Sequence, residues 1–93
     1  MRKYELMVVF PLEEDQFKPG VESLRKTLAD YGAQLVNEEA YGDRDLTYEI
    51  KKRTRGRYIL FNIMASPEKI IEMDQQIKLN VNVLTFMFVR VEE

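Results

Sequence analysis

Hydrophobic positions recur along this chain with two different periods, and each period predicts a different kind of element. Residues 3–10 and 83–91 are apolar at nearly every position, which is typical of strands that are buried on both faces. Residues 34–50 and 57–65 also favour strand, since each combines β-branched and aromatic residues. We therefore expect four strands, with a bulge near Gly42 and Asp43 in the second.

Two other stretches show the helical period. Apolar residues of the first recur at steps of four and three, at Phe17, Val21, Leu24, Leu28 and Tyr31. Asp15 is expected to cap this helix at its N-terminus and Gly32 to end it. The second helix is expected to follow Ser66 as the N-cap, with Pro67 in the first helical position. Its apolar stripe consists of Ile70, Met73 and Ile77.

The resulting order is strand, helix, strand, strand, helix, strand, which predicts an α+β fold of the ferredoxin-like β-α-β-β-α-β type. Right-handed crossovers would place both helices on one face of a four-stranded antiparallel sheet and leave the other face open. The first and third strands would be central. At 93 residues, the chain is expected to form a single domain, residues 1–93. The fourth strand is apolar on both sides, so either some apolar groups stay exposed or a partner covers them.

Residues 41–65 predict a long β-hairpin with a basic tip. Residues 51–57, KKRTRGR, contain five of the fourteen Lys and Arg residues, and Gly56 is expected to supply the positive φ of the turn. Arginine binds phosphate through two parallel hydrogen bonds, and the flanking Tyr48 and Tyr58 offer rings that stack on bases. This composition favours RNA as a partner. The alternative is that the charges only keep a hairpin loop soluble.

The distribution of charge matters more than its sum. The net charge of −2 argues mildly against a general nucleic-acid binder, which is usually basic throughout. Positive residues gather at Arg2 and Lys3 and in residues 51–57, whereas acids gather in residues 13–15 and at the C-terminus. A surface polarised in this way can bind RNA at one end and repel it elsewhere.

The sequence lacks the residue types that most often act in catalysis. Histidine and cysteine are absent, which removes the commonest general base and the most reactive nucleophile. We predict no enzyme activity, no catalytic residue, no cofactor, no metal site and no small-molecule substrate. In an acylphosphatase, an enzyme of the same topology, the loop after the first strand holds phosphate. Here that loop is PLEED, residues 11–15, which would repel phosphate.

We also expect no contact with a membrane. No stretch approaches the roughly 20 apolar residues that a membrane-spanning helix needs, and no signal-peptide pattern is present. The absence of cysteine is typical of intracellular proteins. A cytoplasmic location is therefore expected.

Residues 42–51, GDRDLTYEIK, resemble the signature of the bacterial small-subunit ribosomal protein S6 family. The matching positions are Gly42, Arg44, Asp45, Leu46, Tyr48, Ile50 and Lys51. Thr47 departs from the usual Ser or Ala. The opening MRKYE, the DYGA after the first helix, the RGRY of the third strand and the SPE of the second helix also occupy family positions. The resemblance covers essentially the whole chain.

The resemblance implies a structural, non-catalytic constituent of the small ribosomal subunit. Members of the family bind the central domain of small-subunit ribosomal RNA together with ribosomal protein S18, as a heterodimer. On this basis we expect RNA contacts at Arg2, Lys3, Tyr4, Arg44, Lys51, Lys52, Arg53, Arg55, Arg57 and Tyr58. The expected contacts with the partner protein are Tyr48, Phe86 and Phe88.

A second class of function remains open from the sequence. A ferredoxin-like regulatory module can pair through its sheet and bind a small ligand, and it would be a stable homodimer without affinity for RNA. An acylphosphatase-like hydrolase is a third possibility, which turnover of an acyl phosphate would reveal.

Overall fold

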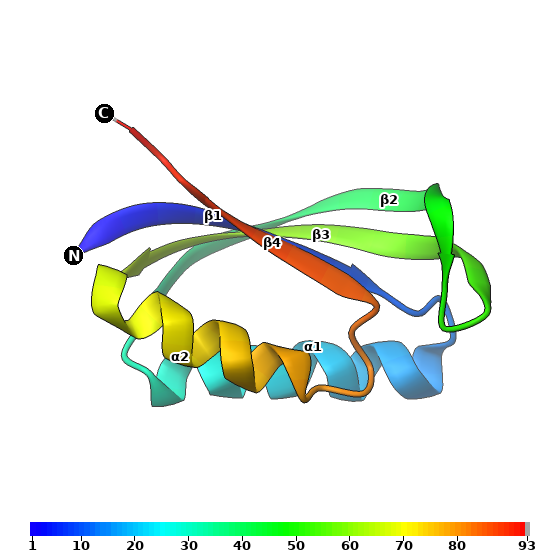
Figure 1. Ribbon diagram of the computed structural model, residues 1–93, viewed down its shortest axis with the longest axis horizontal. Coiled ribbons are helices and arrows are strands. Elements are labelled where there is room, and N and C mark those ends of the chain that lie inside the picture. Colours follow the sequence, from blue (N-terminus) through cyan, green and yellow to red (C-terminus); the bar gives the residue numbers. More distant parts are fainter. Residues whose placement is uncertain (93) are drawn as a thin grey trace.

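Six elements follow the predicted order in the computed structural model, which describes residues 1–92 (Figure 1). They are β1 (Arg2–Phe10), α1 (Glu14–Asp30), β2 (Gln34–Ile50), β3 (Arg53–Ala65), α2 (Pro67–Lys78) and β4 (Thr85–Arg90). The strands form one sheet in the order β2-β3-β1-β4, with every neighbouring pair antiparallel. Both helices cover the same face. The ferredoxin-like prediction, with β1 and β3 central, is therefore confirmed.

The core lies between the sheet and the two helices. Alternate residues of β1 point into it, and Leu6, Val8 and Phe10 are fully buried because successive side chains of a strand point to opposite faces. Val9 and Leu60, on the opposite face, are nevertheless almost completely buried. This burial explains why the sequence of the central strands is apolar on both sides.

The helix boundaries follow local chemistry with one difference from the prediction. Helix α1 has Glu13 as its N-cap, two residues before the expected Asp15, so the acids of residues 13–15 lie at the positive end of the helix dipole. Gly32 follows the helix with a φ of 76°, a conformation that glycine adopts without strain. Ser66 and Pro67 occupy the N-cap and the first position of α2, as predicted.

The hairpin turn differs from the prediction. Lys51 and Lys52 are the central residues, with φ values of 50° and 65°, and Ile50 pairs with Arg53 across them. Strand β3 therefore begins at Arg53 rather than at Arg57.

Gly56 lies inside β3 and does not form the turn. A Cβ atom at this position would be 2.4 Å from Cγ1 of Val9, so the glycine is needed for the close approach of β3 to β1. The predicted bulge of β2 is confirmed, because the register shifts between Ala40 and Gly42. Gly42 has a φ of 84°.

Strand β4 is shorter than the predicted 83–91. Val83 and Leu84 precede the strand, and both are buried in the core. Phe86 and Phe88 pair with Val8 and Leu6, so they face the helices. Met87 is on the open face. No helix in residues 1–92 has the length and hydrophobicity to cross a membrane.

Candidate nucleic-acid interface

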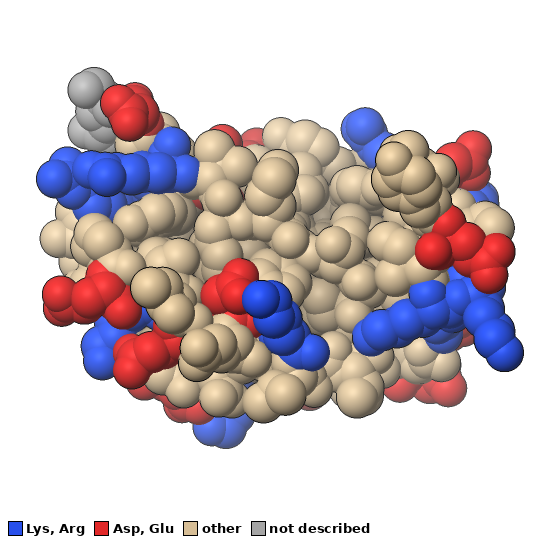
Figure 2. All heavy atoms as spheres, viewed as in Figure 1, with Lys and Arg blue, Asp and Glu red and all other residues tan. Residues whose placement is uncertain are grey.

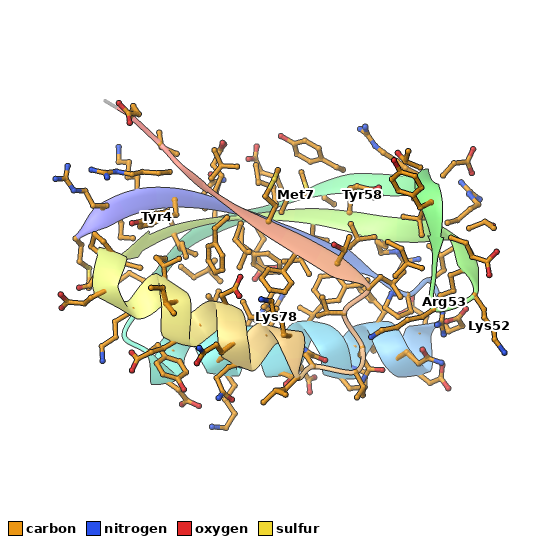
Figure 3. All side chains as sticks on the ribbon, viewed as in Figure 1. Tyr4, Met7, Lys52, Arg53, Tyr58 and Lys78 are labelled. Carbon is orange, nitrogen blue, oxygen red and sulfur yellow. The ribbon has the colours of Figure 1, made fainter. Side chains whose placement is uncertain are left out.

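Acidic side chains of this same chain neutralise the arginines of the hairpin tip. Nη2 of Arg53 lies 3.0 Å from Oε2 of Glu13 and donates a hydrogen bond of 2.7 Å to Oε1 of Gln16. Both partners come from the start of α1, about forty residues earlier in the sequence. Arg53 thus ties the hairpin to the helix (Figure 3).

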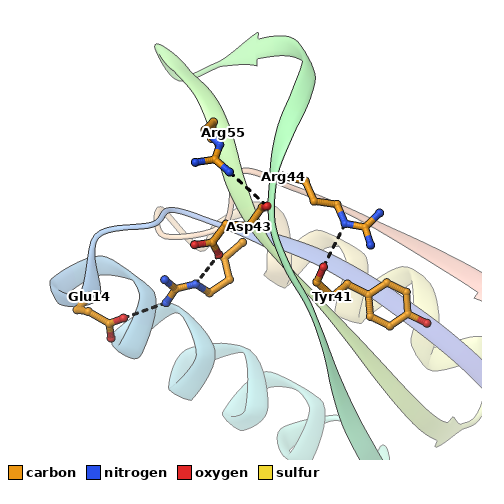
Figure 4. A network of polar contacts seen from close by, with 6 residues as sticks. Glu14, Tyr41, Asp43, Arg44 and Arg55 are labelled. Carbon is orange, nitrogen blue, oxygen red and sulfur yellow. Dashed lines mark hydrogen bonds and ion pairs between the residues drawn. The ribbon is translucent and has the colours of Figure 1, made fainter.

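Arg57 is the centre of a second group of ion pairs (Figure 4). Its guanidinium donates to Oδ1 of Asp43 at 2.9 Å and to Oε1 of Glu14 at 2.9 Å. The same group lies 4.5 Å from the centre of the Phe17 ring, a cation–π contact. The hydrogen bond from Arg57 lowers the pKa of Asp43 below its ordinary value, and the hydrogen bonds to the two acids raise the pKa of Arg57.

The other basic residues of the tip differ in how they are held. Arg55 pairs with Asp45 at 3.2 Å and also donates to the carbonyl oxygen of Asp43. Nζ of Lys51 donates to the carbonyl oxygen of Val83 at 3.1 Å. Lys52 is exposed at the end of the turn and forms no ion pair with the described residues. Basic and acidic groups are consequently mixed at this end of the molecule (Figure 2).

On the open side of the hairpin, an arginine that has no carboxylate partner within residues 1–92 lies beside aromatic rings. Nε of Arg44 donates to the carbonyl oxygen of Tyr41 at 3.1 Å, and its guanidinium lies 5.8 Å from the centre of the Tyr41 ring. Tyr58 pairs with Gly42 and points to the open face with its neighbour in register, Val9. Lys52 lies apart from these side chains, at the tip of the turn beside Arg53 (Figure 3). We call Tyr41, Arg44 and Tyr58, together with Lys52 at the tip, the hairpin surface. Tyr41 was not predicted from the sequence, although its place three residues before Arg44 in a bulge was a usable signal.

The N-terminal residues of the predicted site divide between surface and core. Arg2 and Lys3 are exposed at the start of β1, but Tyr4 is only 7% exposed and packs in the hydrophobic core. Its ring is therefore not available to stack on a base. Arg90, at the end of β4, lies beside this group because it pairs with Tyr4 in the sheet. No sequence motif distinguishes Arg90, and it was not predicted.

The three predicted partner residues do not form one patch. Tyr48 is 78% exposed on the edge strand β2, whereas Phe86 and Phe88 belong to β4, the opposite edge. The two phenylalanines are half-buried against the core, with ring centres 6.1 Å apart. The exposed apolar side chains of β4 are Met87 and Val89.

The arrangement can bind anions through its arginines and aromatic bases through its tyrosine rings. Within residues 1–92, no three His, Cys, Asp or Glu side chains come together as metal ligands. The molecule is thus defined as a ferredoxin-like sheet protein with a basic and aromatic surface along one hairpin.

Comparison with known proteins identifies the family. The model of the family described as Ribosomal protein S6 matches residues 3–90. The protein named small ribosomal subunit protein bS6 of Treponema denticola is 59% identical over 93 residues, 100% of each chain. The protein of the same name from Treponema pallidum is 42% identical over 92 residues, 99% of each chain. The chain belongs to the ribosomal protein S6 family, whose members are structural proteins, so the prediction that it is not an enzyme is confirmed.

A solved structure agrees with this assignment. The crystal structure of 30S ribosomal protein S6 from Thermotoga maritima superimposes with a TM-score of 0.84 at 22% identity, covering 97% of this chain and 87% of the other. At this level of identity the likeness shows the fold alone. It agrees with the sheet order and helix placement described above.

Proposed function

We propose that this chain is a structural component of the small ribosomal subunit that binds the central domain of small-subunit ribosomal RNA together with ribosomal protein S18. The names of the relatives support the first part of the proposal, since each is called a small ribosomal subunit protein. As part of the ribosome, the protein would work in the cytoplasm.

The hairpin surface is the observation that supports RNA binding most directly. Arg44 has no carboxylate partner among the described residues, and it lies against the ring of Tyr41. A guanidinium binds phosphate, and tyrosine rings stack on unpaired bases. Arg53, Arg55 and Arg57 would contact RNA only where phosphate replaces their acids. We therefore assign them a smaller share of the binding than Arg44 and Lys52.

The proposed contact with S18 uses apolar groups that the fold leaves uncovered. Met87 is 61% and Val89 43% exposed, and both lie on the open face beside the half-buried Met7. A protein partner that covers these side chains removes apolar surface from water, which favours association. Tyr48, which lies at the opposite edge of the sheet, would make a contact separate from this apolar group.

The experiment is a binding titration of a central-domain RNA fragment by this protein with S18, repeated at several salt concentrations. The slope of log affinity against log salt is negative, and its magnitude decreases by about 0.7–0.9 for each phosphate that a variant no longer neutralises. We expect Arg44→Gln and Lys52→Gln each to make the slope shallower by this amount. Lys26→Gln, which removes an exposed cation from helix α1, is the matched control and should leave it unchanged.

The contrary outcome is also specific. Unchanged slopes for both variants would remove the hairpin surface from the RNA interface. A purified protein that sediments as a stable homodimer, binds no RNA with S18 present and stays outside small subunits would instead support a ferredoxin-like ligand-binding module.

A further inference from the structure

A second basic region lies at the end of the sheet opposite the hairpin, where β1 begins and β4 ends (Figure 1). Strands β1 and β4 are antiparallel, so the first residues of β1 lie beside the last residues of β4. The backbone N–H of Val91 donates to the carbonyl oxygen of Lys3 at 3.0 Å. This pairing brings Arg2, Lys3 and Arg90 together from two ends of the sequence.

These side chains surround a cavity of about 310 Å³, which we call the sheet-end cavity. Its lining is Met1, Arg2, Lys3, Met64, Arg90, Val91 and Glu92. The volume equals that of roughly ten liquid water molecules, which is enough for a phosphate group with part of its sugar. Three of the seven lining residues are cationic, so the cavity favours an anion.

The two arginines of the cavity, Arg2 and Arg90, differ from the arginines of the hairpin tip in their ion pairs. Neither Arg2 nor Arg90 pairs with a carboxylate within the described part of the chain, whereas Arg53, Arg55 and Arg57 all do. Figure 2 shows Lys and Arg side chains gathered at this end of the molecule, with an acidic side chain beside them.

The positions of the two arginines favour a single shared ligand. Arg90 pairs with Tyr4, two residues after Arg2, so both arginines belong to the helix-facing side of the sheet. Each guanidinium offers a planar pair of donors that matches phosphate oxygens. Glu92 lines the same cavity and would repel the ligand.

We propose that the sheet-end cavity binds one backbone phosphate of RNA between Arg2 and Arg90. The inference rests on the proposed function and adds a discrete contact at the far end of the sheet. RNA would then touch the protein at both ends of its 36 Å long axis.

The test is the same RNA titration with S18, using Arg2→Gln, Arg90→Gln, the double variant and Glu92→Gln. Removal of a charged hydrogen bond costs about tenfold or more in affinity, so each arginine variant should bind about tenfold more weakly. The double variant should make the salt slope shallower by about 0.7–0.9, the value for one phosphate. Glu92→Gln should bind more tightly than the natural protein. Lys26→Gln is again the control, and the melting temperature verifies folding.

The outcomes separate this inference from the proposed function. Binding of RNA by the natural protein with unchanged slopes for the arginine variants would overturn the cavity and leave the hairpin surface intact. A slope that is shallower by about 1.4–1.8 in the double variant would mean that the arginines bind two separate phosphates, and it would overturn the shared site. No RNA binding by the natural protein with S18 would overturn both.

The source of the phosphate is tested by nuclear magnetic resonance of the arginine Nε–H groups. We expect the RNA fragment to shift the signals of Arg2 and Arg90 and inorganic phosphate at equal ionic strength to have little effect. Equal shifts by inorganic phosphate would assign the cavity to a free anion and overturn the RNA contact.

Discussion

At the scale of single residues, the hairpin turn holds two lysines in a conformation that lysine seldom adopts. A non-glycine residue with positive φ costs about 1–2 kcal/mol, and Lys51 and Lys52 are consecutive examples. A two-residue turn with positive φ at both positions is normally built from Asn and Gly. The turn keeps lysine at a conformational cost, in agreement with the assignment of Lys52 to the hairpin surface.

Relief of this strain should be measurable. Lys52→Gly should stabilise the protein by about 1 kcal/mol in urea unfolding, because glycine adopts a φ of 65° without a steric penalty. Lys52→Ala removes the same charge and keeps the strain, so it serves as the control. Equal stability of the two variants would show that the positive φ at Lys52 does not lower the stability of the turn.

The ion pair of Asp43 with Arg57 makes part of the stability depend on pH. The pKa of Asp43 is lower in the folded chain than its ordinary value of 3.8. The pair therefore contributes fully above that value, and its contribution is lost as the pH falls through the folded pKa.

Asp43→Asn should thus lower the melting temperature near neutral pH, and the difference from the natural protein should shrink below pH 3.8. Thermal unfolding followed by circular dichroism across this range measures the effect. Asp15→Asn is the control, because Asp15 forms no ion pair with the described residues. A constant difference at all pH values would contradict a role for the charge of Asp43.

At the scale of elements, the close approach of β1 and β3 depends on a missing side chain. Gly56→Ala would place Cβ 2.4 Å from Cγ1 of Val9, and overpacking of this kind costs about 1–3 kcal/mol. Urea unfolding should show this decrease in stability. Ala at Gly42 has open space around it and is the matched variant, since it tests backbone strain alone. An unchanged free energy of unfolding for Gly56→Ala would mean that β1 and β3 can move apart without loss of stability.

The same element shows why the sequence predicts some features and not others. Strands and helices follow from periodicity, and all six occur in the expected order. The sequence favours Gly56 for the turn because glycine is the usual source of positive φ, whereas Lys51 and Lys52 carry no such signal. The predicted start of β4 is too early because Val83 and Leu84 are buried like strand residues.

The candidate site was predictable only in part for a similar reason. The basic residues were evident from the sequence. Their partners Glu13 and Glu14 lie about forty residues away from Arg53 and Arg57, and a local sequence pattern does not predict ion pairs between residues so far apart. Tyr4 was predictable as a core residue, since it shares the alternating face of Leu6 and Val8.

At the scale of the whole molecule, the proposed S18 interface needs exposed apolar groups that the fold itself does not use. Met87→Ser should weaken association with S18 about tenfold, which corresponds to about 1.4 kcal/mol of binding free energy at an interface residue, and should leave the fold intact. Calorimetry of the two purified proteins measures the affinity.

Ile71→Ser is the matched control, because Ile71 is 68% exposed and lies on helix α2, away from the open face of the sheet. An equal decrease in affinity in both variants would point to a general effect of reduced hydrophobicity. Unchanged affinity for Met87→Ser would exclude this part of the open face from the interface.

The ion pairs of Arg53 with Glu13 and of Arg57 with Glu14 have a consequence for the thermodynamics of binding. They fasten the hairpin to helix α1 in the free protein, so the hairpin surface keeps its shape before any RNA arrives. Ordering a mobile segment on binding consumes free energy, often about 0.5–1.5 kcal/mol for each immobilised side chain. Acidic residues that oppose RNA by their charge thus favour its binding through entropy, because the surface they hold in place has little freedom left to lose.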